Sequence, residues 1–393
     1  MNSASIYLDH SATTPLHPEV LEVMLPYLTE AYGNPGSLHR QGRKARRGIE
    51  TAREQVAALI GADPTEIVFT GSGTEANNMV VTGLESPSSS RAFSMTCSTM
   101  EHHSLLLPFQ HAGRRSPTAA PFLPCDRRGV TEVNPESISP STTLISVMTA
   151  NNETGMIQPI ASLGALCRER GILFHTDAIQ AIGKIPVEVG QLPVDAMSLS
   201  AHKIQGPKGV GAFYLRNGLR LQPLVRGGPQ EGNQRAGTEN VAGIVGFGHA
   251  CQLAQIQLSE GWLEVERLRD HLERSIAERI PDTWLNADSS AERLPHISNV
   301  GFAGLEGEAI MRGLDAEGIS VSTGSACSSG SLDPSHVLLA MGQSRAQAHA
   351  AIRFSLGCQT TRAEMDHVLE VLPGLIERLR SGADDHPRPS PPR

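Results

Sequence analysis

The sequence has few lysines and no closely paired cysteines, and each scarcity excludes a class of protein. Its 393 residues include only four lysines, and the formal net charge is −8. A chain this acidic lacks the basic surface that nucleic-acid binding requires. The six cysteines contain no CxxC pair, which is typical of neither a zinc site nor a small disulfide scaffold. We therefore expect no nucleic-acid partner, no resident metal and a reducing, cytoplasmic location.

Long apolar runs are also absent. No stretch is long enough to cross a bilayer, and the N-terminal residues lack the positive and then apolar pattern of a secretory signal. We expect no membrane partner. What is present is ordinary for a folded protein, because 39% of the residues are hydrophobic. The length is sufficient for a large core and for two domains.

The hydrophobic pattern predicts an α/β fold with a largely parallel sheet. Short apolar runs alternate with helical patterns through most of the chain. An amphipathic helix is expected from about residue 41 to residue 60, ended by Gly61. Buried strands are expected at 67–70, 92–96, 144–149, 172–176, 196–199 and 209–215.

A change of pattern near residue 260 predicts a second, smaller unit of mixed helices and strands. A long helix is expected at 261–280, followed by strands at 297–302, 319–322 and 351–355. The last residues are rich in proline and charge and cannot build a core. The expected division is an N-terminal segment packing with the small domain (1–15), a large cofactor-binding domain (16–258), a small domain (259–380) and a disordered tail (381–393).

Lys203 is the strongest candidate for a lysine that forms a Schiff base, since the alternatives are only Lys44, Lys184 and Lys208. It stands in SLSAHKIQGPKG, after a predicted buried strand and before a turn rich in glycine and proline. Open α/β folds bind ligands at this carboxyl edge of the sheet. A desolvated amine there loses its proton well below its ordinary pKa of about 10.4. By position alone, such a lysine is more often a surface residue.

Other strand ends carry residues that suit the same chemistry. Asp177 follows the strand at 172–176, with Gln180 three residues on. An acid there can keep a cofactor ring nitrogen protonated, although it can equally cap a helix. Asn152 follows the strand at 144–149. His102, after the strand at 92–96, could lie flat on an aromatic cofactor and act catalytically by moving protons, although a lone histidine is more often structural. Polar residues at four strand ends favour one shared site.

A phosphate cradle is expected after the strand at 67–70. The segment GSGTE (71–75) offers free backbone N–H groups, the hydroxyls of Ser72 or Thr74 and the positive end of a helix. The stretch also matches the dinucleotide pattern GxGxxA, which would indicate an oxidoreductase. That alternative is disfavoured because the next strand ends in Cys97 rather than an acid, and because it leaves Lys203 unexplained.

Two residues of the predicted small domain complete the set. Cys327 stands in STGSACSSGS, a run of small polar residues that predicts an exposed, mobile loop. Reactive cysteines need such exposure, whereas most free cysteines are buried and inert. Arg353, on the strand at 351–355, could clamp a substrate carboxylate with its two-pronged guanidinium or form a structural ion pair.

Ten motifs in order then identify a resemblance. They are YLDHSATTP, YGNPGSLH, EIVFTGSGTEANN, EHHS, NNETG, HTDAIQ, SLSAHKIQGPKG, RAGTEN, STGSACSSG and IRFSLG. From about residue 6 to residue 375 the chain resembles the cysteine desulfurases of iron–sulfur cluster assembly and nitrogen fixation. These are fold-type-I pyridoxal-phosphate enzymes of the class V aminotransferase group, here of the type with a long cysteine loop. The resemblance implies a large domain with a mostly parallel seven-stranded sheet and a smaller α+β C-terminal domain.

The resemblance also implies a role for each candidate residue. Lys203 would carry the internal aldimine of pyridoxal 5'-phosphate and later remove the Cα proton of L-cysteine. Cys327 would attack the substrate sulfur, leave alanine and carry a persulfide to an acceptor protein, and it could also ligate an iron–sulfur cluster transiently. On the cofactor ring, Asp177 would pair with the nitrogen, Gln180 would contact the hydroxyl and His102 would stack on the face. The phosphate would be bound by Gly73, Thr74, Ser200 and His202, and by Thr238 from the second subunit of a homodimer. Asn152 and Arg353 would bind the substrate beside the cofactor.

Two departures from the family pattern bear on these implications. The phosphate turn reads GSGTE where the family more often has SGATE, so Gly73 replaces an alanine. The C-terminal tail does not resemble the end with which cluster-assembly members dock their scaffold, so the sulfur acceptor stays open. The alternatives are selenocysteine or cysteine-sulfinate cleavage, a dinucleotide-dependent oxidoreductase, and a weakly active scaffold for cluster-assembly partners.

Overall fold

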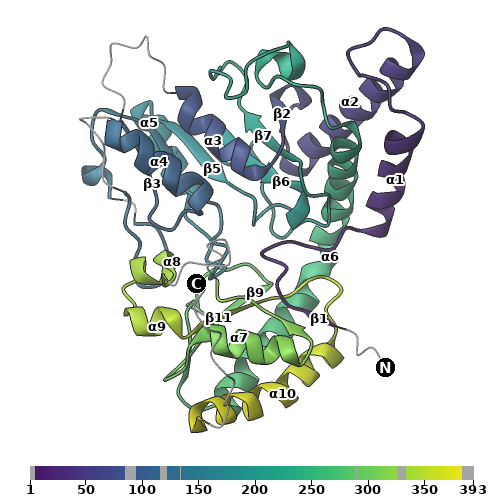
Figure 1. The fold of residues 1–393 in the computed structure, drawn as a ribbon. Coiled ribbons are helices and arrows are strands. Elements are labelled where there is room, and N and C mark those ends of the chain that lie inside the picture. Colours follow the sequence, from purple (N-terminus) through teal and green to yellow (C-terminus); the bar gives the residue numbers. More distant parts are fainter. Residues whose placement is uncertain are drawn as a thin grey trace, which may run out of the picture.

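The computed structural model describes residues 5–84, 94–115, 122–132, 134–288, 290–324 and 333–382, and it consists of two packed units joined by one long helix (Figure 1). The larger unit is built on a sheet with the strand order β2-β7-β6-β5-β4-β3. Its strands are β2 (Ile67–Thr70), β3 (Ser94–Cys97), β4 (Thr142–Ser146), β5 (Leu173–Asp177), β6 (Ala196–Ser200) and β7 (Gly211–Leu215).

The sheet is mostly parallel, as predicted. Strands β3 to β6 pair in parallel, whereas β7 runs antiparallel to both β6 and β2. The resemblance implied seven strands, but the sheet has six in the described part of the chain. Next to β3, the residues that the structure describes form a single bridge, between Ser98 and Leu123. After Leu123 the chain turns back, and Cys125 pairs with Thr131 in antiparallel fashion.

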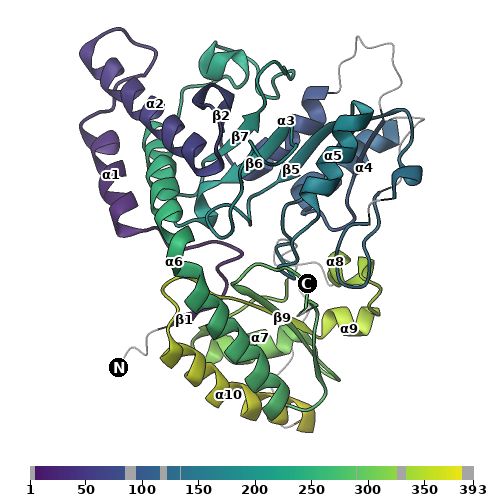
Figure 2. The ribbon, with the colours of Figure 1, turned by 180° about the vertical axis from the view of Figure 1, so that it is seen from behind.

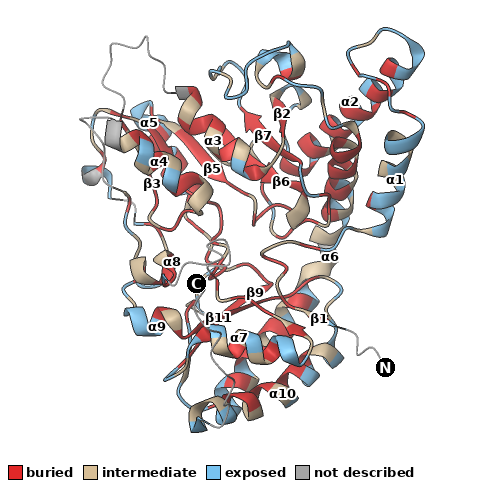
Figure 3. Ribbon diagram, in the orientation of Figure 1, coloured by how far each residue is buried: buried red, intermediate tan, exposed pale blue. Residues whose placement is uncertain are grey.

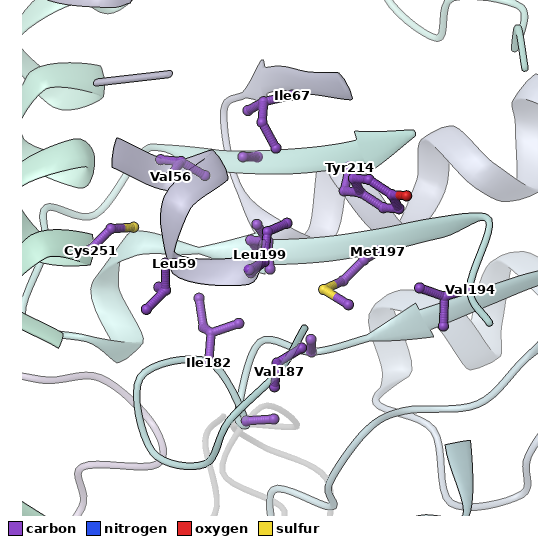
Figure 4. Close-up of a cluster of buried hydrophobic side chains, with 14 of the residues drawn as sticks. Val56, Leu59, Ile67, Ile182, Val187, Val194, Met197, Leu199, Tyr214 and Cys251 are labelled. Carbon is purple, nitrogen blue, oxygen red and sulfur yellow. The ribbon is translucent and has the colours of Figure 1, made fainter. Parts of the chain in front are cut away.

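Helices cover both faces of this sheet, so successive strand residues enter different cores. In β2, Ile67 and Phe69 pack with α2, α5 and the first half of α6, whereas Val68 packs with α3 and α4. Figure 4 shows part of the first core, in which Ile67, Leu199 and Tyr214 lie together. The helices are α1 (Pro18–Thr29), α2 (Arg40–Ile60), α3 (Gly73–Leu84), α4 (His103–Arg115), α5 (Ile160–Arg170) and α6 (Val241–Arg279).

The smaller unit packs around the second half of α6 (Figure 2). Its antiparallel sheet has the order β11-β9-β8, and a short parallel pair joins β1, near the N-terminus, to β10. The strands are β1 (Ile6–Tyr7), β8 (Thr283–Leu285), β9 (Ile297–Phe302), β10 (Ile319–Ser320) and β11 (Ala351–Ser355). The helices are α7 (Gly307–Ala316), α8 (His336–Ala340), α9 (Arg345–His349) and α10 (Arg362–Ser381).

Helix α6 begins 20 residues before the predicted start at Gly261, because its glycine-rich first half is also helical. A Cβ at Gly248 would lie 2.6 Å from Cα of Ala52 in α2, and one at Gly246 would lie 2.6 Å from Sδ of Met24 in α1. These glycines lower helix propensity but permit close helix packing. The domain boundary after residue 258 stays a prediction. The residues at 383–393 lie outside the described part of the chain, and no described helix is long and apolar enough to cross a membrane.

Candidate active site

The predicted residues meet in one cavity of about 240 Å³ at the carboxyl edge of the large sheet, where it faces the smaller unit. Those of the prediction that line it are Gly73, Thr74, His102, Asn152, Asp177, Gln180, Ser200, His202, Lys203 and Arg353. Thr238 is exposed and does not line it. Cys327 lies outside the described residues, although Gly324, three positions earlier, lines the cavity.

Lys203 ends a short 3₁₀ turn (η3, Ala201–Lys203) that directly follows β6. Its Nζ donates hydrogen bonds to the carbonyl oxygens of Ser11, at 2.5 Å, and Ala12, at 2.7 Å. Both carbonyls belong to the segment that follows β1. These two contacts were not predicted, because a backbone acceptor leaves no signature in residue type.

Asp177 and Gln180 lie on the same wall of the cavity, and both are buried. The Asp177 carboxylate accepts hydrogen bonds from Asn77 Nδ2 at 2.7 Å and from Ile179 N at 2.9 Å. Burial raises the pKa of Asp177, while these hydrogen bonds and Lys203 oppose the rise. Gln180 Nε2 donates to the Ser11 carbonyl at 2.8 Å, and its Oε1 has no partner among the described residues.

His102 lines the same cavity, just before α4, and its imidazole is neutral near pH 7. Burial and the nearby charge of Lys203 lower its pKa to about 4. Its Nδ1 lies 2.8 Å from Ser104 Oγ and accepts a hydrogen bond from Ser104 N at 3.1 Å. Accepting from a backbone N–H at Nδ1 leaves the ring proton on Nε2. Neighbouring Glu101 is fully buried, and burial together with Asp177 raises its pKa well above the usual value.

The predicted phosphate turn lies between β2 and α3. Ser72 caps the helix: its Oγ accepts from Glu75 N at 3.1 Å, and its carbonyl oxygen accepts from Ala76 N at 3.1 Å. The first N–H groups of a helix have no intrahelical acceptor. Gly73 and Thr74 are the first two residues of α3, and they line the cavity. A Cβ at Gly73 would lie 2.3 Å from Ile179 Cδ1, which explains a glycine at this position.

Ser200 and His202 flank Ala201 at the end of β6 and line the cavity, and Ser200 Cβ would lie 3.3 Å from a Cβ at Gly73. The ring Nδ1 of His202 lies 3.1 Å from Thr13 Oγ1. Burial lowers the pKa of His202 to about 4, with a contribution from Lys203. The imidazole is therefore neutral and can donate a hydrogen bond without adding a charge.

Arg353 forms a structural ion pair at the wall of the cavity. From β11, its Nη2 pairs with Asp9 Oδ1 at 2.7 Å and its Nη1 donates to the carbonyl of Asn152 at 2.9 Å. Arg353 is therefore one half of a structural ion pair. Its partner Asp9 was not predicted. The guanidinium nevertheless lines the cavity, and its buried Nε has no acceptor among the described residues. Within those residues, no group of three or more His, Cys, Asp or Glu could hold a metal ion.

Comparison with known families identifies the lineage of this arrangement. The model of the family "Aminotransferase class-V" matches residues 6–368. The chain belongs to the class-V aminotransferase family. This class-V chain is 48% identical to the cysteine desulfurase IscS of Dictyoglomus turgidum over 380 residues, which is 96% of this chain and 95% of the relative. It is 45% identical to a cysteine desulfurase of Trichormus azollae over 378 residues, 96% of this chain and 94% of the relative.

Solved structures agree with this lineage. A NifS-like protein superposes with a TM-score of 0.89 at 35% identity, covering 95% of the class-V chain and all of the other. A structure described as SspA in complex with cysteine superposes with a TM-score of 0.78 at 33% identity, covering 91% of this chain and 100% of that one. The fold-type-I prediction, a large, mostly parallel sheet with a smaller unit, is confirmed.

Proposed function

We propose that this class-V family member is a pyridoxal-phosphate-dependent cysteine desulfurase, which converts L-cysteine to L-alanine and retains the sulfur on Cys327. The observation that carries the proposal is the convergence of Lys203, Asp177 and the start of α3 on one cavity. An amine, a carboxylate and a set of helix N–H groups match the aldehyde, the ring nitrogen and the phosphate of this cofactor.

The residues present fit the cofactor. Gln180 Oε1 is a buried acceptor without a described partner, placed to receive a ring hydroxyl. The Asp177 carboxylate has spare lone pairs beyond its two hydrogen bonds and can hold a ring nitrogen protonated. The phosphate would rest on Gly73 and Thr74, with Ser200 and His202 adding donors. When bound, the protonated ring supplies a sink for negative charge at the substrate Cα.

Different side chains of the cavity would then have different roles in the reaction. Lys203 Nζ, held by two carbonyls of the N-terminal segment, would move the Cα proton. His102 would cover the ring as a neutral imidazole. Arg353 would bind the substrate carboxylate through its free edge, while Asp9 fixes its position, and Asn152 would contact the substrate beside it.

Cys327 would take the sulfur. Its thiolate attacks the substrate sulfur, the C–S bond breaks with its electron pair going to carbon, and a proton completes alanine. The sulfur stays on Cys327 as a persulfide until an acceptor thiolate removes it. The other cysteines are poorly suited, because burial raises the pKa of Cys97, of Cys251 and, to about 12, of Cys167.

The partners would be a sulfur-acceptor protein and a second copy of the chain. Helix α1 presents an apolar row, Leu21, Leu25 and Leu28, that is exposed in the single chain (Figure 3). Exposed Thr238 adjoins Glu239, which pairs with Arg46 of α2 at 3.3 Å. These features support a homodimer in which Thr238 reaches the partner's phosphate site. The described cysteines are all free thiols, which supports a reducing, cytoplasmic location.

One measurement tests the activity directly. The purified chain is given L-cysteine and a reductant, and alanine and sulfide are measured together; we expect equal amounts. Lys203→Ala should make no alanine, and borohydride reduction of the wild type should fix the cofactor to a peptide containing Lys203. A colourless protein would contradict the cofactor assignment and favour an oxidoreductase or a scaffold.

A second test separates proton removal from sulfur transfer. Cys327→Ser should still bind cofactor and cysteine but make no alanine, since a serine hydroxyl is scarcely ionised near neutral pH whereas a thiol has a pKa of about 8.5. Mass spectrometry after a cysteine pulse should find the extra sulfur on Cys327. Finding it on Cys358 or Cys97 would overturn the persulfide assignment. Continued selenide release from selenocysteine by this variant would fit a selenolate that leaves without thiol attack.

A further inference from the structure

Glu75 in the first turn of α3 joins two segments that the sequence separates by 160 residues. Its Oε1 accepts from Arg235 Nε at 2.7 Å, and its Oε2 accepts from Arg235 Nη2 at 3.2 Å and from Gly71 N at 2.8 Å. Both side chains are largely covered, with 16% of Glu75 and 24% of Arg235 exposed. A two-pronged pair of this kind fixes orientation as well as distance.

The Glu75 carboxylate decides which N–H groups remain for a ligand. In a standard capping box, the side chain at this position accepts from the N–H of the capping residue, here Ser72. Glu75 instead accepts from Gly71 N, one residue earlier, and its own N–H is taken by Ser72 Oγ. The carboxylate therefore does not occupy the N–H of Ser72, and it fixes the turn beside the N–H groups of Gly73 and Thr74, which have no intrahelical acceptor and lie at the cavity.

The loop that carries Arg235 is anchored at Glu231. Glu231, four positions earlier, accepts from Arg53 Nη1 and Nη2, each at 2.8 Å, and from Phe69 N at 2.8 Å. Glu231 has the positive backbone angle φ = 47°, which is costly for a residue with a side chain. The buried Arg53–Glu231 ion pair and the bond from Phe69 N therefore hold the loop that contains Glu231 against β2, the strand that leads into the phosphate turn.

We propose that Glu75, oriented by Arg235, is the positioning residue that shapes the α3 N-terminus into the phosphate subsite of the cofactor. Glu75 bonds to the turn and does not line the cavity, so it acts through the N–H groups of Gly73 and Thr74. Arg235 has a second effect, because it neutralises a carboxylate that would otherwise face a phosphate dianion across one helical turn. The inference rests on the proposed cofactor and adds how its phosphate is recognised.

The test compares two ligands that differ only in the phosphate. The full chain is stripped of cofactor and titrated with pyridoxal phosphate and with pyridoxal, following visible absorbance. We expect Glu75→Ala to weaken pyridoxal-phosphate binding at least about tenfold, the scale of one charge-assisted hydrogen bond, and to change pyridoxal binding less than about twofold. Glu75→Gln, which keeps an acceptor for Gly71 N, should lose less than Glu75→Ala.

A matched control distinguishes positioning from general loss of stability. Glu273 and Arg293 form a comparable two-pronged pair, with both contacts at 2.6 Å, away from the cavity. Glu273→Ala should lower stability and leave both ligand affinities unchanged. Equal weakening of the two ligands by Glu75→Ala, or no weakening of either, would overturn the inference. Failure of the wild type to bind either ligand would instead overturn the proposed cofactor.

Discussion

The pKa of Asp177 is subject to opposing effects, and their balance decides whether its side chain is ionised. Burial raises its pKa, whereas Asn77, Ile179 N and the Lys203 charge favour the ionised form. A cationic ring nitrogen would add a further partner for the carboxylate. The side chain is thus placed to be ionised when the cofactor is bound, which a simple helix cap would not require.

We expect Asp177→Asn to retain the cofactor and to lose at least about a hundredfold in turnover. The phosphate turn and Lys203 supply binding, whereas only the carboxylate holds the ring nitrogen protonated. Visible absorbance measures cofactor retention, and alanine formation from cysteine measures turnover. Activity near that of the wild type would mean that Asp177 only caps the segment at Ile179.

Gly73 and Ile179 form a coupled pair. A Cβ at residue 73 would lie 2.3 Å from Ile179 Cδ1 and 3.3 Å from Ser200 Cβ. We expect Gly73→Ala to push Ile179 aside and to weaken cofactor binding severalfold, because Ile179 lies between Asp177 and Gln180. Removing Cδ1 with the second substitution Ile179→Val should restore most of the affinity. Absence of rescue in a cofactor titration would locate the effect at Ser200 instead.

At this scale the sequence predicted most of the side chains that line the cavity and missed several of the groups that hold them. Lys203, Asp177 and Gln180 follow buried strands, and the edge of a parallel sheet brings such residues together whatever the details of packing. Asp9 and Asn77 were missed because their partners are distant in sequence. The structural role of Arg353 emerged only with Asp9, since an ion pair depends on where both side chains end up.

Among the elements, predicted strands match observed ones because burial on both faces gives continuous apolar runs. Strand β2 has its predicted limits, and β6 extends one residue beyond its prediction. Helix α6 begins 20 residues before its predicted start, since close packing against α2 overrode the low helix propensity of its glycines. The pairing of β1 with β10 joins chain segments that no local pattern connects.

The link between α2 and the loop before Thr238 gives a prediction at the same scale. Arg53 is the main partner of buried Glu231, and its guanidinium also lies 4.9 Å from the centre of the Phe69 ring. We expect Arg53→Met to cost about 3–5 kcal/mol in unfolding free energy, because it leaves a buried carboxylate unpaired. Chemical denaturation measures the loss. The double variant Arg53→Met, Glu231→Gln should recover part of it, and no recovery would argue against the ion pair as the cause.

For the whole molecule, buried imidazoles predict sensitivity to acid. Burial lowers the pKa of His10, His102 and His202 to about 4 and that of His175 to about 3. Each binds a proton more readily when unfolded, so its contribution is complete above about pH 6.5 and is lost as the pH falls towards 4. The raised pKa values of Glu101 and Asp177 make the folded chain more stable as the pH falls, but these two carboxyl groups are fewer than the four histidines.

We therefore expect the cofactor-free chain to lose several kcal/mol of stability, in order of magnitude, between pH 7.5 and pH 5. Denaturant titrations at several pH values measure it. His296 is fully buried, with neither ring nitrogen bonded to a described group, and burial keeps its pKa well below the usual value. The variant His296→Leu should show a shallower pH dependence. A stability that is flat or rises towards pH 5 would contradict this assignment of charges.

The proposed homodimer gives the last prediction, which concerns where each active site obtains its residues. If Thr238 serves the partner's phosphate, a mixed dimer of Lys203→Ala and Thr238→Ala chains contains one site with both residues and one with neither. We expect the two variants, each impaired when assayed alone at limiting pyridoxal phosphate, to regain about half of the wild-type rate per dimer when co-expressed under two affinity tags. If Thr238 instead acted within its own chain, both sites of the mixed dimer would stay defective, and alanine formation would not rise above that of the Thr238→Ala chain alone.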